Sequence, residues 1–164
     1  MKVNCLKGVL GLGLLLAAAG CHSFNSLPLD VSETRYEEFI PQEDFQAAPL
    51  FKHLVRSYGK DIEHERLKIQ HLILQTETSA FEFNRNGIIY DGRTTADHLR
   101  KKYRKKFKDI TTARDYIDQI ATRSSQSGRY YLVYPGNGYA YHSRDLLYYE
   151  LNRLEKAINK EAAS

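Results

Sequence analysis

The chain has 164 residues, and its 24 Lys and Arg side chains against 20 Asp and Glu give a formal net charge of +4. That length can bury the core of one domain, and so small a net charge does not by itself indicate a class of partner. Cys5 and Cys21 are the only cysteines. The chain beyond Cys21 therefore has no disulfide, no cysteine-ligated metal and no cysteine nucleophile.

The first 20 residues have the pattern of a secretion signal. Lys2 and Lys7 form a short positive region, residues 9–19 are apolar apart from two glycines, and small residues precede Cys21. This order is typical of a signal peptide. The apolar run is about half of the roughly 20 residues that a membrane-spanning helix needs, so a permanent N-terminal anchor helix is the less favoured alternative.

The residues around Cys21 make this signal more specific. Residues 18–21, Ala-Ala-Gly-Cys, resemble the lipobox of bacterial lipoproteins, although that pattern usually has Leu where this chain has Ala18. The resemblance implies cleavage before Cys21, diacylglycerol on its sulfur and a fatty acid such as palmitate on its amine. Acyl chains that each contribute about 0.8 kcal/mol per buried CH₂ would anchor the protein to the membrane.

The residue after Cys21 bears on the location. It is His22, whereas Asp at this place would favour retention in the inner membrane. We therefore expect a lipid-anchored protein of the bacterial cell envelope, in the outer membrane and facing the periplasm. Without Lys2 and Lys7 the chain has 22 basic and 20 acidic side chains. This balance, together with a periplasmic location, argues against a nucleic-acid partner.

Residues 21–48 are predicted to be the lipidated N-terminus and a tether, because they carry Pro28 and Pro41, an acidic cluster and no clear periodicity. A fully solvated tether would rarely hold several large apolar groups within ten residues, so packing of part of it on the domain stays open. These groups are Tyr36, Phe39, Ile40 and Phe45. The domain itself is expected over residues 49–160.

The predicted domain opens with two helices and a hairpin. Residues 49–58 and 61–76 have apolar side chains at helical spacing, and Pro49 suits a first helical position. Beyond them, apolar and polar residues alternate, as in a half-buried strand. Asn86-Gly87 is a strong signal for a tight turn, so a hairpin is predicted over about 81–91.

The second half of the chain predicts further helices and another hairpin. Thr94 or Thr95 is expected to cap one helix, Thr112 the next and Ser143 the last. Strands on either side of the turn at 135–138 predict a hairpin over about 130–141. We therefore expect a single α+β domain, in which a small antiparallel sheet from two hairpins packs with four to five helices.

Two apolar patterns in this half predict which side chains are buried. In the helix after Thr94 the apolar stripe is Ala96, Leu99, Tyr103 and Phe107. Strand alternation puts Tyr131 and Val133 on one side of the second hairpin, and Tyr130, Leu132 and Tyr134 on the other. The second side is either an exposed binding surface rich in Tyr or a sheet face covered by other elements.

Residues 62–155 resemble the YfeK-like proteins, a small family of proteobacterial envelope proteins catalogued as a domain of unknown function. The resemblance lies in the order and spacing of Phe83-Asn-Arg-Asn-Gly87, Ala96-Asp-His-Leu-Arg-Lys-Lys102, Ala113-Arg-Asp-Tyr-Ile117, Ser124-Ser-Gln-Ser-Gly128 and Tyr131-Leu-Val133. It implies a fold and an envelope location but no known activity. Many members have a cysteine in each hairpin, where this chain has Phe81 and Tyr134, so the resemblance implies an aromatic contact in place of a cross-link.

A run of cations follows the first hairpin and is the strongest candidate for a binding surface. On a helix whose apolar stripe faces the core, these side chains would spread over the exposed surface, and like charges four residues apart cost a few tenths of a kcal/mol each. That cost favours an anionic partner, and the alternative is a solvated helix face. The run comprises Arg100, Lys101, Lys102, Arg104, Lys105, Lys106 and Lys108.

A polar set within the resembling segments raises the question of a hydrolase. Asp97 and His98 are adjacent on a predicted helix and therefore point about 100° apart, which disfavours a catalytic pair. The alternative is a set of caps and turns. The set comprises Arg85, Asn86, Asp97, His98, Ser124, Ser125 and Ser127. His64 and His71 would lie about 10 Å apart along a helix, too far for one metal ion. No catalytic residue, metal or cofactor is predicted.

The preferred hypothesis is a lipid-anchored, non-enzymatic binding or structural module that contacts an anionic envelope component or a protein partner through the basic helix. Besides Cys21 as the lipidation site, the predicted binding residues are Arg85, Asn86, His98, Arg100, Lys101, Arg104, Lys105 and Lys108. The alternatives are a small hydrolase acting on cell wall or lipid, and an inhibitor or immunity-type protein.

Overall fold

A computed structural model describes residues 49–57 and 61–163. The predicted signal peptide, the lipidation site Cys21, the tether, and Tyr58 and Gly59 at the end of the first predicted helix all lie outside the described residues. These expectations stay predictions.

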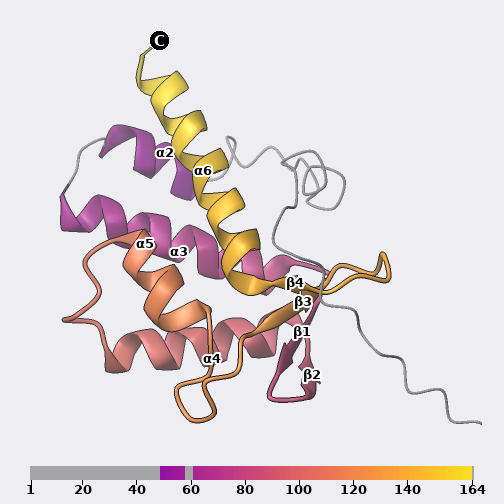
Figure 1. The fold of residues 1–164 in the computed structure, drawn as a ribbon. Coiled ribbons are helices and arrows are strands. Elements are labelled where there is room, and N and C mark those ends of the chain that lie inside the picture. Colours follow the sequence, from indigo (N-terminus) through magenta and orange to yellow (C-terminus); the bar gives the residue numbers. More distant parts are fainter. Residues whose placement is uncertain (1–48, 58–60, 164) are drawn as a thin grey trace, which may run out of the picture.

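The described chain is a small α+β domain, as predicted (Figure 1). Its strands form one antiparallel sheet in the order β2-β1-β3-β4. The elements in chain order are α2 (Pro49–Arg56), α3 (Ile62–Thr78), β1 (Glu82–Arg85), β2 (Ile88–Tyr90), α4 (Gly92–Lys105), α5 (Ala113–Tyr116), the π-helical turn η2 (Ile117–Ala121), β3 (Leu132–Tyr134), β4 (Tyr141–His142) and α6 (Ser143–Ala162).

The first hairpin forms where the sequence predicts it. Asn86 and Gly87 both have positive φ, 58° and 89°, which is the backbone that a tight two-residue turn requires. β1 then pairs on its other edge with β3, so the two hairpins make a single sheet. In that pairing Glu82 lies opposite Tyr134, and the Tyr134 hydroxyl accepts a hydrogen bond from Asn84 Nδ2 at 3.4 Å.

Helix α3 lies at the centre of the helical part, packed against α2, α4, α5 and α6 (Figure 1). The main core cluster joins α3, α4, α5, η2 and α6, and it includes Leu72, Leu99, Tyr116, Ile120 and Leu151. Leu99 belongs to the predicted apolar stripe of α4. A smaller cluster lies between α2, α3 and the C-terminal half of α6, and it contains Phe51, Leu54, Leu67, Leu154 and Ile158. Helix α6 therefore contributes to both clusters.

The start of α4 corrects one prediction. The cap is Asp91, whose carboxylate accepts a hydrogen bond from Thr94 N at 2.7 Å, so neither Thr94 nor Thr95 caps this helix. Asp97 consequently lies in the second turn of the helix. Helix α4 also begins against the last carbonyls of α3: a Cβ on Gly92 would lie 2.3 Å from Thr76 O. Only a glycine permits this approach.

Two further helix ends differ from expectation, and one agrees. Thr112 caps α5 as predicted, with Asp115 completing a capping box. Ser143 does not cap α6, because it is the first residue of the helix and His142 holds the cap position without a side-chain bond. Helix α4 ends at Lys105, so Phe107 lies beyond it, 40% exposed, with its ring beneath the Arg66 guanidinium. Phe107 is therefore not part of a buried stripe.

Candidate functional site

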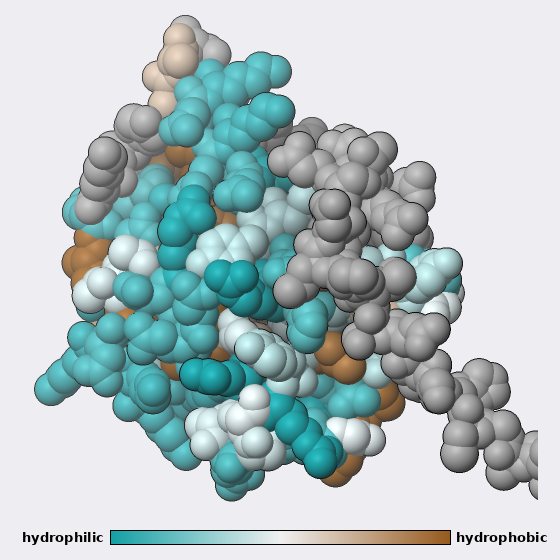
Figure 2. All heavy atoms as spheres, viewed as in Figure 1, coloured by the Kyte–Doolittle hydropathy of each residue, from teal (hydrophilic) through white to brown (hydrophobic). Residues whose placement is uncertain are grey.

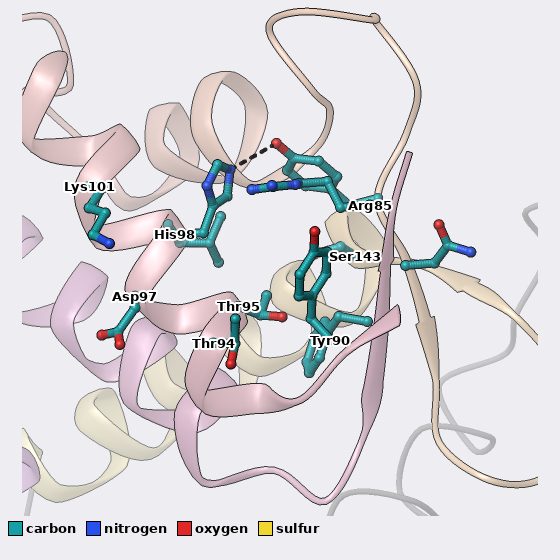
Figure 3. Close-up of a pocket in the computed structure, with 12 residues that line it drawn as sticks. Arg85, Tyr90, Thr94, Thr95, Asp97, His98, Lys101 and Ser143 are labelled. Atoms are coloured by element: carbon teal, nitrogen blue, oxygen red, sulfur yellow. Dashed lines mark hydrogen bonds between the residues drawn. The ribbon is translucent and has the colours of Figure 1, made fainter. Parts of the chain in front are cut away.

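A pocket of about 310 Å³ lies between the β1–β2 hairpin and α4 (Figure 3). Its walls come from parts of the chain that are distant in sequence: the hairpin, the first three turns of α4, the residue before β3 and the first residue of α6. The lining residues are Phe83, Asn84, Arg85, Tyr90, Thr94, Thr95, Asp97, His98, Leu99, Lys101, Tyr131 and Ser143.

Helix α4 and the segment around β3 fix the positions of these side chains. Thr94, Thr95, His98 and Lys101 recur at helical spacing and therefore share one face of α4. Opposite them, Tyr131 is held through its backbone on both sides, because its N–H donates to Thr122 O and its carbonyl accepts from Ser143 N, each at 3.0 Å. The pocket is thus built on fixed elements rather than on a free loop.

His98 is a neutral side chain in this pocket at physiological pH. Burial, and then the positive charges of Arg85 and Lys102, lower the pKa of His98 to about 4. Its Nε2 lies 3.4 Å from the Tyr131 hydroxyl, and the two rings meet edge to face. Burial raises the pKa of Tyr131, opposed by Arg85. Both rings are therefore uncharged hydrogen-bonding groups.

Arg85 brings a positive charge to the pocket without an acidic partner among residues 49–57 and 61–163. Its guanidinium lies over the Tyr90 ring, 5.1 Å from the centroid, and reaches from β1 toward His98 (Figure 3). Asp97 is the carboxylate in the lining, but its Oδ1 accepts a hydrogen bond from Arg100 at 3.0 Å. Figure 3 shows Asp97 turned away from Arg85.

The loop at residues 124–128, which we name the serine loop, does not line this pocket. Ser124 is buried, and its hydroxyl accepts from the backbone N–H groups of Gln126 and Ser127 and from Asn86 Nδ2. Ser127 Oγ in turn donates to Asn86 Oδ1 at 2.6 Å. In the described chain His98 has no hydrogen bond to Ser124, Ser125 or Ser127. These residues connect the hairpin turn to the loop, so they form turns and caps rather than a catalytic triad.

The basic run is divided by the fold. Arg100 is paired with Glu77 and Asp97. Lys102 is partly buried and donates to the carbonyls of Ile120 and Arg123, at 2.6 and 2.7 Å, near the end of η2. Burial, then the charges of Lys106, Arg123 and Arg85, lower the pKa of Lys102 to about 8. The expectation that the whole run spreads over the surface is therefore wrong for Lys102.

Five cations of the run remain exposed and have no ion pair within the described ranges: Lys101, Arg104, Lys105, Lys106 and Lys108. Lys106 and Lys108 lie beyond the end of α4. Lys101 also lines the pocket. The structure thus brings Arg85, His98 and Lys101 together, separates Asn86 from them, and places Arg104, Lys105 and Lys108 on the exposed surface outside the pocket lining. We name Lys101, Arg104, Lys105, Lys106 and Lys108 the basic face.

Sequence reasoning missed several members of the pocket. Either Thr94 or Thr95 was expected as a cap, Ser143 as another cap, and Tyr131 only as a side chain on one face of a strand. The hairpin motif and the α4 stripe could have indicated one wall. No local pattern shows that the residue before β3 and the start of α6 lie opposite it.

The histidines of α3 have structural surroundings. His71 Nε2 lies 2.8 Å from Glu150 Oε1, and both side chains are 4% exposed. Among the residues that the structure describes, no three His, Cys, Asp or Glu side chains are arranged to hold a metal ion. Within the same residues no helix combines the length and the apolar character needed to cross a membrane.

Comparison with known proteins gives one match. Residues 63–155 match the model of a family of unknown function, DUF5329. This range contains every residue that lines the pocket and the whole basic face. No curated protein and no solved structure matches the chain.

Proposed function

Since the chain belongs to DUF5329, a family of unknown function, we propose a role from its own surface: a non-enzymatic module that binds an anionic component of the bacterial cell envelope through the basic face. The observation that supports this proposal is the set of five exposed cations that have no ion pair in the described chain.

The distribution of acidic residues supports the same reading. Some acidic side chains elsewhere on the domain are engaged by cations: Glu155 by Lys68 and Arg114, and Asp118 by Arg144. No such partner serves the basic face within residues 49–57 and 61–163, so its charges are available to a ligand. Figure 2 shows a mainly hydrophilic surface on the viewed side, with hydrophobic residues in separate patches. Because the basic face consists of lysine and arginine side chains, charge rather than apolar contact would dominate binding to it.

The predicted lipid at Cys21 would complement such a surface. A lipid anchor holds a domain close to headgroups and raises the local concentration of the anionic groups that the basic face could contact. Each Lys or Arg near an anionic membrane contributes about 1 kcal/mol, and this attraction falls off within a Debye length. The proposal therefore predicts binding that weakens as the salt concentration rises.

A charge-matched pair of variants tests this function. The test protein is residues 22–164, which contain both core clusters and lack the predicted lipid. The surface variant carries Arg104→Gln, Lys105→Gln and Lys108→Gln. The control carries Lys52→Gln, Arg56→Gln and Lys156→Gln, three exposed cations on α2 and α6. Sedimentation is measured with vesicles of phosphatidylethanolamine and phosphatidylglycerol.

The surface variant is expected to bind these vesicles at least tenfold more weakly than the unsubstituted protein, and the control to lose less than threefold. Loss of three cations at about 1 kcal/mol each would permit a larger loss of binding free energy. The expected loss is smaller because the long side chains are flexible and exposed to solvent. Equal binding by the surface variant and the control would contradict the proposal. Binding to envelope protein extracts but not to vesicles would indicate that the partner of the basic face is an acidic protein.

A further inference from the structure

We propose that the pocket between the hairpin and α4 binds a sugar that carries a phosphate group. This inference goes beyond the function proposed above, because it does not require Arg104, Lys105 or Lys108. It rests on three independent features of the pocket: the charge of its lining, a serine hydroxyl that has no hydrogen bond within the described chain, and lining residues around a space that fits one sugar ring.

The charge of the lining favours an anion. Arg85 has no acidic partner in the part of the chain that the structure describes, and Lys101 is exposed at the same pocket. The lining carboxylate, Asp97, is already bound by Arg100 and turned away (Figure 3). A planar guanidinium with two free N–H edges matches the geometry of a phosphate, and a flexible ammonium can add a second contact.

A serine hydroxyl lies at the same space. Ser143 is only 5% exposed and lines the pocket, and its hydroxyl has no hydrogen bond to any described residue. Its oxygen is not among the fully enclosed unpaired polar atoms of the described residues, so a ligand in the pocket can reach it. The hydroxyl of a sugar could both donate to and accept from Ser143. A purely apolar ligand that displaced water from the pocket would leave it unsatisfied.

The remaining walls suit a polyhydroxylated ring. Tyr90 and Tyr131 line the space, and Thr95 and the neutral His98 add hydrogen-bonding groups around it. Figure 3 shows Tyr90, Thr95 and His98 around this space. A volume of about 310 Å³ is at the lower end of the roughly 300–1,000 Å³ of small-molecule sites. The pocket therefore fits one sugar unit rather than a section of a polysaccharide chain.

The pocket is also held in place before a ligand arrives. The His98–Tyr131 contact joins α4 to the segment before β3. The bonds from Asn86 to Ser124 and Ser127 hold the hairpin turn, and with it Arg85, against the serine loop. A site formed in this way needs little ordering on binding, which is the requirement for useful affinity toward a small polar ligand.

Isothermal titration of residues 22–164 with glucose 6-phosphate tests the proposal. Glucose and inorganic phosphate are the two partial ligands, and glucuronate tests a carboxylate in place of the phosphate. Arg85→Gln is expected to weaken glucose 6-phosphate binding at least tenfold, and Ser143→Ala about fivefold. The surface variant is expected to change it less than twofold. The two partial ligands are expected to bind at least tenfold more weakly than the sugar phosphate.

Several outcomes would overturn the proposal: no binding of glucose 6-phosphate, equal binding of inorganic phosphate, tighter binding of glucuronate, or an Arg85→Gln variant that binds as well as the unsubstituted protein. An NMR titration supports the assignment if the amides of Thr95, His98 and Ser143 shift, and a shift confined to the basic face contradicts it. The Arg85→Gln variant and the surface variant are tested separately. A negative result for the pocket therefore does not contradict vesicle binding by the basic face, and a negative result for the basic face does not contradict sugar phosphate binding in the pocket.

The same chemistry could come from a free sugar phosphate or from the phosphorylated sugar headgroup of a lipid. Vesicles that contain lipid A, whose headgroup is a phosphorylated glucosamine disaccharide, separate these sources. Binding that is lost in Arg85→Gln and displaced by glucose 6-phosphate assigns the site to a lipid headgroup. Binding of soluble glucose 6-phosphate without any Arg85-dependent binding to these vesicles assigns it to a free ligand.

Discussion

His98 shows how the fold changes the chemistry of one residue. The sequence shows a histidine beside an aspartate, which invites a catalytic interpretation. In the structure its neighbours are cations and its hydrogen-bond partner is Tyr131, so burial and positive charge lower its pKa to about 4. The side chain therefore serves as a neutral hydrogen-bond donor or acceptor. Its burial lowers the stability of the folded state only at acidic pH.

The depressed pKa predicts a specific acid sensitivity. Between pH 6.5 and 4 an unfolded chain binds a proton at His98 that the folded chain does not, so stability falls as the pH falls through this window. Above pH 6.5 both states are neutral and the effect vanishes. Between pH 7.5 and 4.5 the unsubstituted protein should lose on the order of 1 kcal/mol more than His98→Gln, after discounting for solvent screening.

Thermal melting at the two pH values measures this difference, and about 1 kcal/mol corresponds to about 4–8 °C for a domain of this size. Burial also lowers the pKa of His64. His64 is present in both proteins, so its contribution cancels. An identical gap in melting temperature at pH 7.5 and pH 4.5 would contradict the predicted pKa of His98.

Tyr116 presents the opposite case, a polar group that the fold leaves unsatisfied. Its side chain is fully buried in the main core cluster, and its hydroxyl has no hydrogen-bond partner among the described residues. Removing such a group removes its desolvation cost. Tyr116→Phe is therefore expected to stabilise the domain by about 1 kcal/mol in urea unfolding, with Tyr130→Phe, an exposed tyrosine, as the neutral control. A loss of stability would show that the hydroxyl has a partner such as a bound water.

At the level of single elements, the junction of α3 and α4 controls the geometry of the pocket. Helix α4 carries six lining residues, and its first turn lies directly on the last carbonyls of α3. Alanine usually favours a helix over glycine by about 1 kcal/mol. Here a Cβ at position 92 would lie 2.3 Å from a backbone oxygen, a contact that no rotamer change can relieve.

Gly92→Ala is consequently expected to destabilise the domain by about 1–3 kcal/mol despite its better helix propensity. Arg93→Ala, at the next and exposed position, is the matched control and should change stability by less than about 0.5 kcal/mol. Urea unfolding of the two variants gives the comparison. A neutral Gly92→Ala would mean that α4 can move away from α3.

How far the sequence predicts each element depends on whether its signal is local. The turn at Asn86-Gly87 and the Thr112 cap each lie within a few residues, and the structure confirms them. The prediction of where α4 begins was wrong, because Asp91 suits the end of a hairpin as well as a helix cap. Only the packing of α4 against α3 decides between these two roles.

The candidate site was predictable only in part for the same reason. Arg85 and His98 were singled out because the motifs that carry them are local. The residues that complete the pocket around them come from distant parts of the sequence: Tyr131 before β3, and Ser143 at the start of α6. The burial of Lys102 likewise follows from its contact with the end of η2 and has no signature within its own helix.

For the molecule as a whole, a buried polar contact links α3 to α6. His71 and Glu150 meet between the region of the main core cluster and that of the smaller cluster, in a place where both are almost fully buried. Glu150 Oε2 also lies 3.5 Å from Arg153, so the carboxylate has a second neighbour. Such buried polar pairs are costly to break and often cheap to replace.

A double-mutant cycle tests this balance. His71→Leu leaves the Glu150 carboxylate buried without its nearest partner and should cost about 3 kcal/mol. The double variant His71→Leu, Glu150→Leu removes both groups and should recover more than half of that loss. Chemical unfolding of the two single variants and the double variant supplies the coupling energy. Additive losses would show that the two side chains act independently.

The pairing of β1 with β3 has a consequence for the order of folding. This pairing closes a loop that contains β2, α4, α5 and η2, whereas the β1–β2 hairpin closes over two residues. Long closures carry the larger entropy cost and form late. Arg85 and Tyr131 flank this ladder, so the pocket becomes complete only once nearly the whole described chain has folded. A ligand bound in the pocket would stabilise the β1–β3 pairing, the last part of the chain to form. It would therefore slow amide exchange in β1 and β3 more than in α2.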